Sequence, residues 1–173
     1  MKSETKAMKL KALFWFIVYV FIFSTYFIWD KKLSGGIGHV SFIVGVFLFF
    51  YSLALTAIAG RTLKRFAHEK IGEFIPDRFV DNGIYSCMRH PMHLGIGLLP
   101  LSFALISGNL AMILASGWGI GATFWFVLAI EEPETLVKYK DDYIKYLQKT
   151  PAFSLNLKCL KNSFSVITLN HTF

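Results

Sequence analysis

Long apolar stretches that alternate with short polar segments dominate this chain. Four apolar stretches contain no Lys, Arg, Asp or Glu: residues 12–29, 37–59, 92–106 and 110–130. The first, second and fourth reach the roughly 18 to 25 residues that an α-helix needs to cross the hydrocarbon core of a bilayer. The third covers only about 22 Å, so we expect it to start below the headgroups. The pattern predicts an all-α, polytopic helical membrane protein with about four transmembrane helices.

The polar segments after the second and fourth stretches show helical spacing of their own. Residues 134–148 carry large side chains at intervals of three and four, which is typical of an amphipathic helix. These side chains are Leu136, Tyr139, Tyr143, Tyr146 and Leu147. Residues 62–73 repeat this spacing among basic residues, which favours a surface continuation of the second span that ends before Pro76. A fifth, shorter membrane-embedded segment within 62–79 is an open alternative.

Composition and charge agree with a membrane protein and indicate its orientation. Hydrophobic residues make up 54% of the 173 residues, and 18 are Phe, far above a soluble domain of this size. Of the 18 Lys and Arg, only Lys31 and Lys32 fall between the first two stretches, and the rest lie in segments on the other side. We therefore expect both termini and the helix at 134–148 to be cytoplasmic. This topology, with attraction to anionic lipid, explains the net charge of +7, so we expect no nucleic-acid partner.

The two cysteines, Cys87 and Cys159, fall on the predicted cytoplasmic side. Thiols there normally stay reduced. We therefore expect no disulfide, and we expect Cys87 to be an inert loop thiol.

The tripeptide Arg89-His90-Pro91 directly precedes the third apolar stretch. Proline is well tolerated as the first residue of a helix, so Arg89 and His90 should lie at a helix mouth. The free N–H groups, the helix dipole and the Arg89 charge would together attract an anionic group. His90 as a purely structural residue at the helix start is the plainer alternative.

A second charged group, Glu131-Glu132, follows the fourth apolar stretch. The short turn at residues 107–109 must join the third and fourth helices as an antiparallel hairpin. The hairpin brings the two glutamates to the same end as Arg89 and His90. A solvated charge run at a membrane boundary is the plainer interpretation of the glutamates.

Five short motifs in register carry a family resemblance. They are Asn82-Gly-Ile-Tyr85, Arg89-His-Pro-Met92, Glu131-Glu132-Pro133, Asp142-Tyr143-x-x-Tyr146 and Thr150-Pro151. In this order and spacing, over about residues 79–153, the chain resembles the isoprenylcysteine carboxyl methyltransferase and phospholipid methyltransferase family of integral membrane enzymes. It departs from the family at His93, where Tyr is usual, at Lys140, where Gly is usual, and at Ala152, where Arg is frequent.

The resemblance implies S-adenosylmethionine as cofactor and a division into residues 1–60, an N-terminal helix pair, and 61–173, a cofactor-binding catalytic half with the hairpin at 92–130. Within that half, Arg89 and Glu132 are the candidate catalytic residues, and no metal site is expected. The implied cofactor-binding residues are Tyr85, Arg89, His90, Pro91, His93, Leu94, Glu131, Glu132, Tyr143 and Tyr146.

For the acceptor, the bulky apolar surface at residues 47–51 favours a molecule with a hydrocarbon tail that enters from lipid, such as a prenylated cysteine carboxylate or a lipid amine. Three alternatives stay open. They are methylation of a small thiol, a metal-dependent membrane enzyme that uses His90, His93 and the neighbouring glutamates, and a non-catalytic lipid-binding relative.

Overall fold

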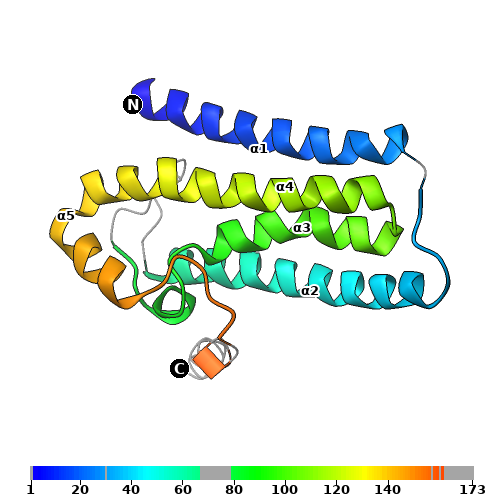
Figure 1. Ribbon diagram of the computed structural model, residues 1–173. Helices are drawn as coiled ribbons and strands as arrows, with labels where there is room; N and C mark the ends of the chain where they lie inside the picture. Colours follow the sequence, from blue (N-terminus) through cyan, green and yellow to red (C-terminus); the bar gives the residue numbers. More distant parts are fainter. Residues whose placement is uncertain (1, 30, 67–78, 157, 160, 162–173) are drawn as a thin grey trace. The chain divides into compact units, whose positions relative to one another are not determined.

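The computed structural model describes residues 2–29, 31–66, 79–156, 158–159 and 161, and these residues form helices and connecting loops without a strand (Figure 1). The all-α prediction is confirmed. The elements in chain order are α1 (Lys2–Ile28), α2 (Gly35–Phe66), the short 3₁₀ helix η1 (Gly83–Ser86), α3 (Pro91–Ser107), α4 (Leu110–Phe126), the π-helical segment η2 (Val127–Glu131) and α5 (Glu132–Lys149).

Three helical stretches in the described residues are long and apolar enough to cross a membrane: Lys9–Ile28, Gly35–Phe66 and Leu110–Lys149. Helix α3 is apolar but shorter, as its sequence indicates. Large apolar side chains on these helices point outward; Phe27 is 87% exposed and Phe47 is 72% exposed. Such exposure is unfavourable in water and favourable in lipid, so the protein is a membrane protein with about four spans.

Helix α2 continues without a break through Phe66, so the predicted helical continuation is confirmed for residues 62–66. The rest of that prediction, including Pro76 and the possible fifth segment, lies outside the described residues. By contacts, the chain divides into two units. Unit 1 comprises Met1–Ser52 and Ile96–Phe124, and unit 2 comprises Leu53–Gly95 and Trp125–Phe173. The division at residue 60 by role in catalysis stays a prediction.

Unit 1 packs its helices closely around small residues. Its core contains Val18, Ile22, Ala104, Met112 and Ala115. At two glycines a neighbouring helix lies too close to leave room for a side chain. An added Cβ at Gly45 would lie 2.7 Å from the Ile106 nitrogen, and one at Gly97 would lie 2.6 Å from the Thr123 hydroxyl. Small residues at helix contacts are the usual way in which membrane helices gain packing.

Pro100 leaves one carbonyl of α3 without its helical partner. Proline has no N–H, so the carbonyl four residues earlier, at Ile96, cannot receive the usual hydrogen bond. The Tyr19 hydroxyl of α1 donates to this carbonyl at 2.7 Å. A side chain from another helix thus provides the hydrogen bond that the proline cannot donate, as a membrane interior requires.

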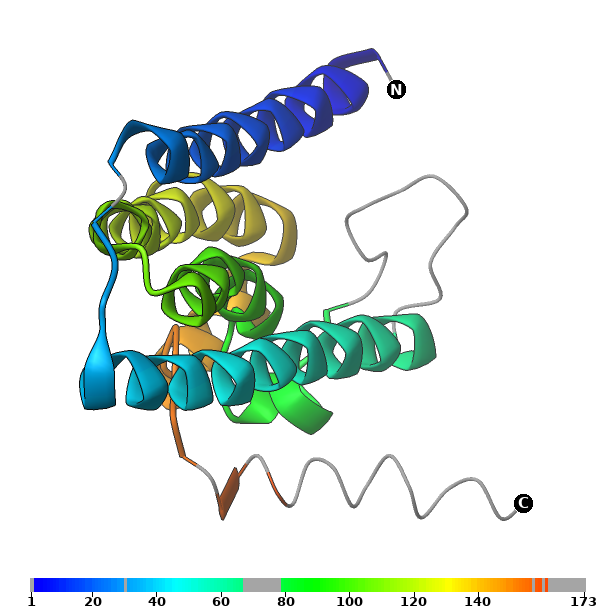
Figure 2. The ribbon, with the colours of Figure 1, turned by 90° about the vertical axis from the view of Figure 1, so that its right-hand side faces the viewer.

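Asn109 organises the turn between α3 and α4, which lies at the same end of unit 1 as the α1–α2 link (Figures 1 and 2). Gly108 adopts a left-handed conformation (φ +66°) that reverses the chain. The fully buried Asn109 amide donates to the Trp29 carbonyl at 2.8 Å, and its oxygen accepts the Met112 N–H at 2.9 Å. One side chain therefore caps α4 and binds the end of α1, and the predicted hairpin turn at 107–109 is confirmed.

Candidate functional site

Helix α3 begins at Pro91, as predicted, and the chain after α5 folds back along the loop before it. The N–H groups of Arg89 and His90 donate to the carbonyls of Pro151 and Ala152, at 3.0 and 3.1 Å. The backbone N–H groups of these two residues are therefore bonded within the protein. Anion binding by the first-turn N–H groups of α3 stays a prediction.

Glu132 is the centre of the site's charge network. One of its carboxylate oxygens, Oε1, accepts hydrogen bonds from Arg89 Nε at 2.9 Å, from Arg89 Nη2 at 2.5 Å and from His90 Nε2 at 3.2 Å. Arg89 Nη1 donates to the Thr150 carbonyl. The prediction that the glutamates and the Arg-His pair lie at the same end is confirmed. Arg89 thus already has a carboxylate partner within the protein.

His90 is neutral in this environment. Burial lowers the pKa of its imidazole to about 3, and repulsion from His93 and Arg89 acts in the same direction. The contact with Glu132 is therefore a hydrogen bond from a neutral N–H rather than an ion pair. His90 holds Glu132 in place and does not carry charge at neutral pH.

His93 and Glu131 form a second pair beside the first. His93 Nε2 lies 3.7 Å from Glu131 Oε1, and each side chain is 21% exposed. Arg89, by comparison, is 10% exposed. Of the two pairs, the one formed by His93 and Glu131 is the more open to a ligand.

The π-helical segment η2 explains how both neighbouring glutamates reach α3. Residues 127–131 follow an i→i+5 hydrogen-bond pattern between α4 and α5. Such a segment shifts the facing of the residues that follow it, and π-helical turns are frequent at functional sites. Pro133 then lies in the first turn of α5, where its missing N–H costs little.

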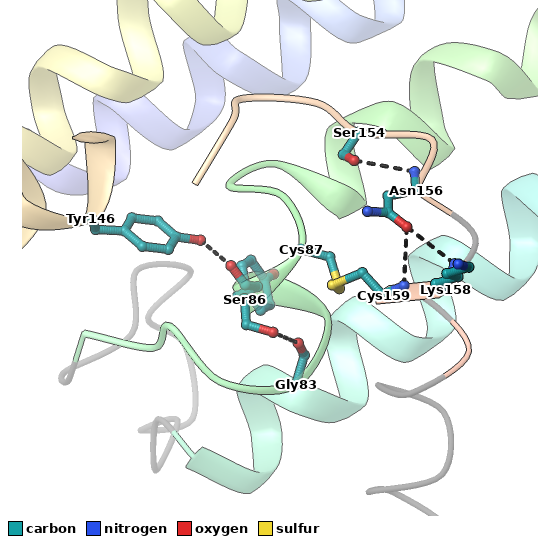
Figure 3. Close-up of a disulfide and its surroundings, with 9 residues drawn as sticks. Gly83, Ser86, Cys87, Tyr146, Ser154, Asn156, Lys158 and Cys159 are labelled. Atoms are coloured by element: carbon teal, nitrogen blue, oxygen red, sulfur yellow. Dashed lines mark hydrogen bonds between the residues drawn. A yellow bond between two sulfur atoms is a disulfide. The ribbon is translucent and has the colours of Figure 1, made fainter. Parts of the chain in front are cut away.

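Aromatic residues of α5 enclose the site from one side. Phe79 packs against Tyr143 and Tyr146, with ring centroids 6.1 and 5.1 Å apart. The Tyr146 hydroxyl donates to the Tyr85 carbonyl at 2.5 Å, so two of the predicted cofactor-binding residues are bonded to each other (Figure 3). The Tyr143 side chain is only 2% exposed, and its hydroxyl lies near Arg89 and Glu132 without a hydrogen bond of good geometry to any described residue. A buried hydroxyl with unused hydrogen-bonding capacity is a candidate ligand contact.

Helix α5 reaches this arrangement through a kink at Lys140, which has φ +47° and ψ −118°. This region is essentially confined to glycine, so a lysine here stores strain. The chain thus keeps a backbone shape suited to glycine at the position where the family usually has one.

Two further predicted residues have secondary places. The backbone N–H of Leu94 donates to the His90 carbonyl at 3.1 Å within α3, and Tyr85 is buried at the end of η1. The sequence reasoning missed the part of the chain that closes the mouth, namely Thr150, Pro151, Ala152 and Phe153. The Thr150-Pro151 motif was the available signal.

Cys87 and Cys159 are joined in a disulfide, with Cα atoms 5.8 Å apart, and the prediction of two reduced thiols is wrong (Figure 3). That prediction rested on the compartment alone. It could not include the return of the segment after Pro151 to the loop before Arg89, which brings the two sulfur atoms together.

Among the described residues there is no group of three or more His, Cys, Asp or Glu side chains arranged to hold a metal ion.

Comparison with known proteins identifies the family to which this site belongs. No curated protein and no solved structure matches the chain. The family described as phospholipid methyltransferase matches residues 36–142, which is more than half of the sequence and includes α3, α4 and both glutamates. The chain therefore belongs to the phospholipid methyltransferase family of membrane methyltransferases.

Proposed function

We propose that the protein is an S-adenosylmethionine-dependent methyltransferase that acts on a lipophilic acceptor at the cytoplasmic face of the membrane. The observation that carries this proposal is the convergence of the two His–Glu pairs and the Tyr143 hydroxyl at the mouth of α3. This convergence lies within unit 2, and most of its residues fall within the region that matches the family.

The residues present suit this cofactor. S-adenosylmethionine carries a carboxylate, an ammonium group and two ribose hydroxyls, and when bound it supplies a methyl group on a positively charged sulfur. Glu131, as a partly open carboxylate, accepts hydrogen bonds from hydroxyl or ammonium donors. The Tyr143 hydroxyl offers a buried donor and acceptor, and His93 a ring nitrogen.

Arg89, His90 and Glu132 have a different role in this proposal from the one that the sequence indicates. Because their polar atoms bond to one another and to Thr150, they fix the start of α3 against the start of α5. Methyl transfer to a nucleophile is an in-line displacement that depends on alignment and on exclusion of water. Arg89 and Glu132 therefore position the residues that contact the cofactor, with His90 as their neutral support.

The membrane helices favour a lipophilic acceptor. Helix α3 starts at the site and α4 leads into it, so the site lies where apolar helices meet a charged segment. The Lys and Arg distribution favours the cytoplasm as that side. An acceptor with a tail in the bilayer and a small head, such as a lipid amine or a prenylated cysteine carboxylate, would bring its head to this boundary.

The cofactor is tested by titration calorimetry of the detergent-solubilised protein with S-adenosylmethionine and its demethylated product. Glu131→Gln should weaken binding about ten- to a hundredfold, because it removes a charge-assisted hydrogen bond worth roughly 1.5–3 kcal/mol. Glu134→Gln, the same change at an exposed position of α5, should bind normally. Equal affinity in wild type and Glu131→Gln would place the cofactor elsewhere.

The acceptor is tested by methyl transfer to a series of molecules with one head group and tails of increasing length. Each methylene buried from water adds up to about 0.8 kcal/mol, so kcat/KM should rise with tail length for a lipophilic acceptor. A site that a small thiol reaches by free diffusion would gain nothing from a longer tail. A kcat/KM that does not depend on tail length would therefore overturn the lipid assignment.

A further inference from the structure

The disulfide joins two segments that are far apart in the sequence and that meet beside the site. Cys87 follows η1 and precedes Arg89 by two residues, whereas Cys159 lies 72 residues later, beyond α5. Cys87 is buried, with 5% of its surface exposed, and Cys159 is half-buried. Cys159 is therefore the more exposed of the two bonded residues.

The segment after α5 that ends at Cys159, described for residues 150–156 and 158–159, we call the strap. Its first part closes the α3 mouth, because the carbonyls of Pro151 and Ala152 accept the N–H groups of Arg89 and His90. The Phe153 ring lies 6.1 Å from the His90 ring. Each of these contacts joins the strap to Arg89 or His90, the two residues that bond to Glu132.

The far part of the strap is shaped to present Cys159. The Asn156 side-chain oxygen accepts the backbone N–H groups of Lys158 and Cys159, at 3.1 and 3.3 Å, and the Ser154 hydroxyl accepts the N–H of Asn156 at 3.2 Å (Figure 3). Lys158 and Cys159 are helical, so the Asn156 side chain caps the start of this helical turn. The disulfide is the one covalent link between this turn and the loop that carries Arg89.

We infer that Cys87–Cys159 is a reversible thiol–disulfide exchange site, and that its oxidation state decides how firmly the strap holds the α3 mouth. The co-reactant is a dithiol. One of its thiolates attacks the Cys159 sulfur, the S–S bond breaks, and Cys87 leaves as a thiolate that takes up a proton. The second thiol of the reductant then attacks the mixed disulfide and releases Cys159. The protein gains two electrons and two protons, and the dithiol becomes a disulfide.

The proposed location of the site agrees with such exchange. In a reducing compartment, disulfides that form are usually transient and act as redox sensors. After reduction, the strap loses its covalent link to the loop that carries Arg89, so it separates more often from Arg89 and His90. The loosened mouth should bind cofactor more weakly, and this one consequence rests on the function proposed above.

The test uses the full chain purified in detergent, oxidised or treated with dithiothreitol. The cysteine state is measured by the mass added by a maleimide under denaturing conditions. Hydrogen–deuterium exchange then follows the amides of Arg89 and His90. Reduction should speed their exchange about tenfold or more, because local opening is no longer opposed by the disulfide. The Leu110 amide, which donates to the Lys31 carbonyl in unit 1, should be unchanged and serves as the internal control.

Cys159→Ser and Cys87→Ser should each behave as the reduced protein does, with or without dithiothreitol. Unchanged exchange at Arg89 and His90 on reduction, or two free thiols in protein exposed to a disulfide oxidant, would overturn the inference. The exchange measurement needs no cofactor. Failure to bind S-adenosylmethionine in either redox state would therefore count against the proposed function alone, and fast exchange on reduction would still support the strap.

Discussion

Glu132→Gln is the most direct perturbation of the charge network. Glutamine keeps the size of the side chain and one carbonyl oxygen but removes the charge that Arg89 and His90 face. Arg89 stays charged and keeps an acceptor, but it loses the opposing charge; removing one partner of a fully buried ion pair costs roughly 3–5 kcal/mol, and the retained acceptor reduces this to about 2 kcal/mol. Arg89 is 10% and Glu132 15% exposed, so solvent compensates for little of the lost ion pair. The free energy of unfolding should fall by about 2 kcal/mol, roughly thirtyfold in the equilibrium constant.

Unfolding of the detergent-solubilised protein by sodium dodecyl sulfate, followed by circular dichroism, measures this change. Glu134→Gln is the matched control and should lie within about 0.5 kcal/mol of wild type. Arg89→Gln should cost a similar amount to Glu132→Gln, and the double variant should cost clearly less than the sum, because both changes remove the same contact. A Glu132→Gln protein as stable as the Glu134→Gln control, or full additivity in the double variant, would refute the reasoning.

Three further changes test other features by the same unfolding measurement. Lys140→Gly should stabilise the protein by about 1 kcal/mol, because glycine adopts the backbone conformation of the kink without strain. Lys145→Gly, at an exposed helical position of α5, is the control and should destabilise the protein by about 1 kcal/mol. Two changes of the same sign would contradict backbone strain at Lys140. Burial lowers the pKa of His90 from 6.5 to about 3, so only the unfolded chain takes up its proton between these values, and stability should fall as the pH drops through that window. His90→Gln should flatten this fall, and a slope identical to wild type would contradict the neutral imidazole. Tyr19→Phe should cost about 1 kcal/mol, and much less when Pro100→Ala restores a backbone donor to the same carbonyl; an equal cost in both backgrounds would contradict the assigned partner.

Local chemistry made the helices and one end of the site predictable. Pro91 marked the start of α3, because its ring suits the first helical position, and the short turn before Leu110 required a hairpin. The hairpin alone was sufficient to place Glu132 near Arg89. These inferences depend on a helix start and a tight turn, and the geometry of both is set by residues that are close together in the sequence.

The parts that could not be predicted depend on long-range return of the chain. The strap has no apolar period, so apart from the Thr150-Pro151 motif nothing in it indicated that Pro151 would bond Arg89 or that Cys159 would reach Cys87. The Lys140 kink is equally invisible to residue pattern, because lysine favours a regular helix. The neutral state of His90 follows from burial, which only the folded chain provides.

The Asn109 turn has a consequence for how the protein should respond to acid. It holds α1, α3 and α4 of unit 1 through an amide and backbone carbonyls, and none of these groups takes up a proton between pH 7 and 3. Unit 2 instead relies on a neutral His90, whose lowered pKa makes the site unfavourable for a proton that the unfolded chain accepts. Acidification should therefore abolish cofactor binding while the helices of unit 1 stay assembled, leaving an inactive protein that is still folded in the membrane.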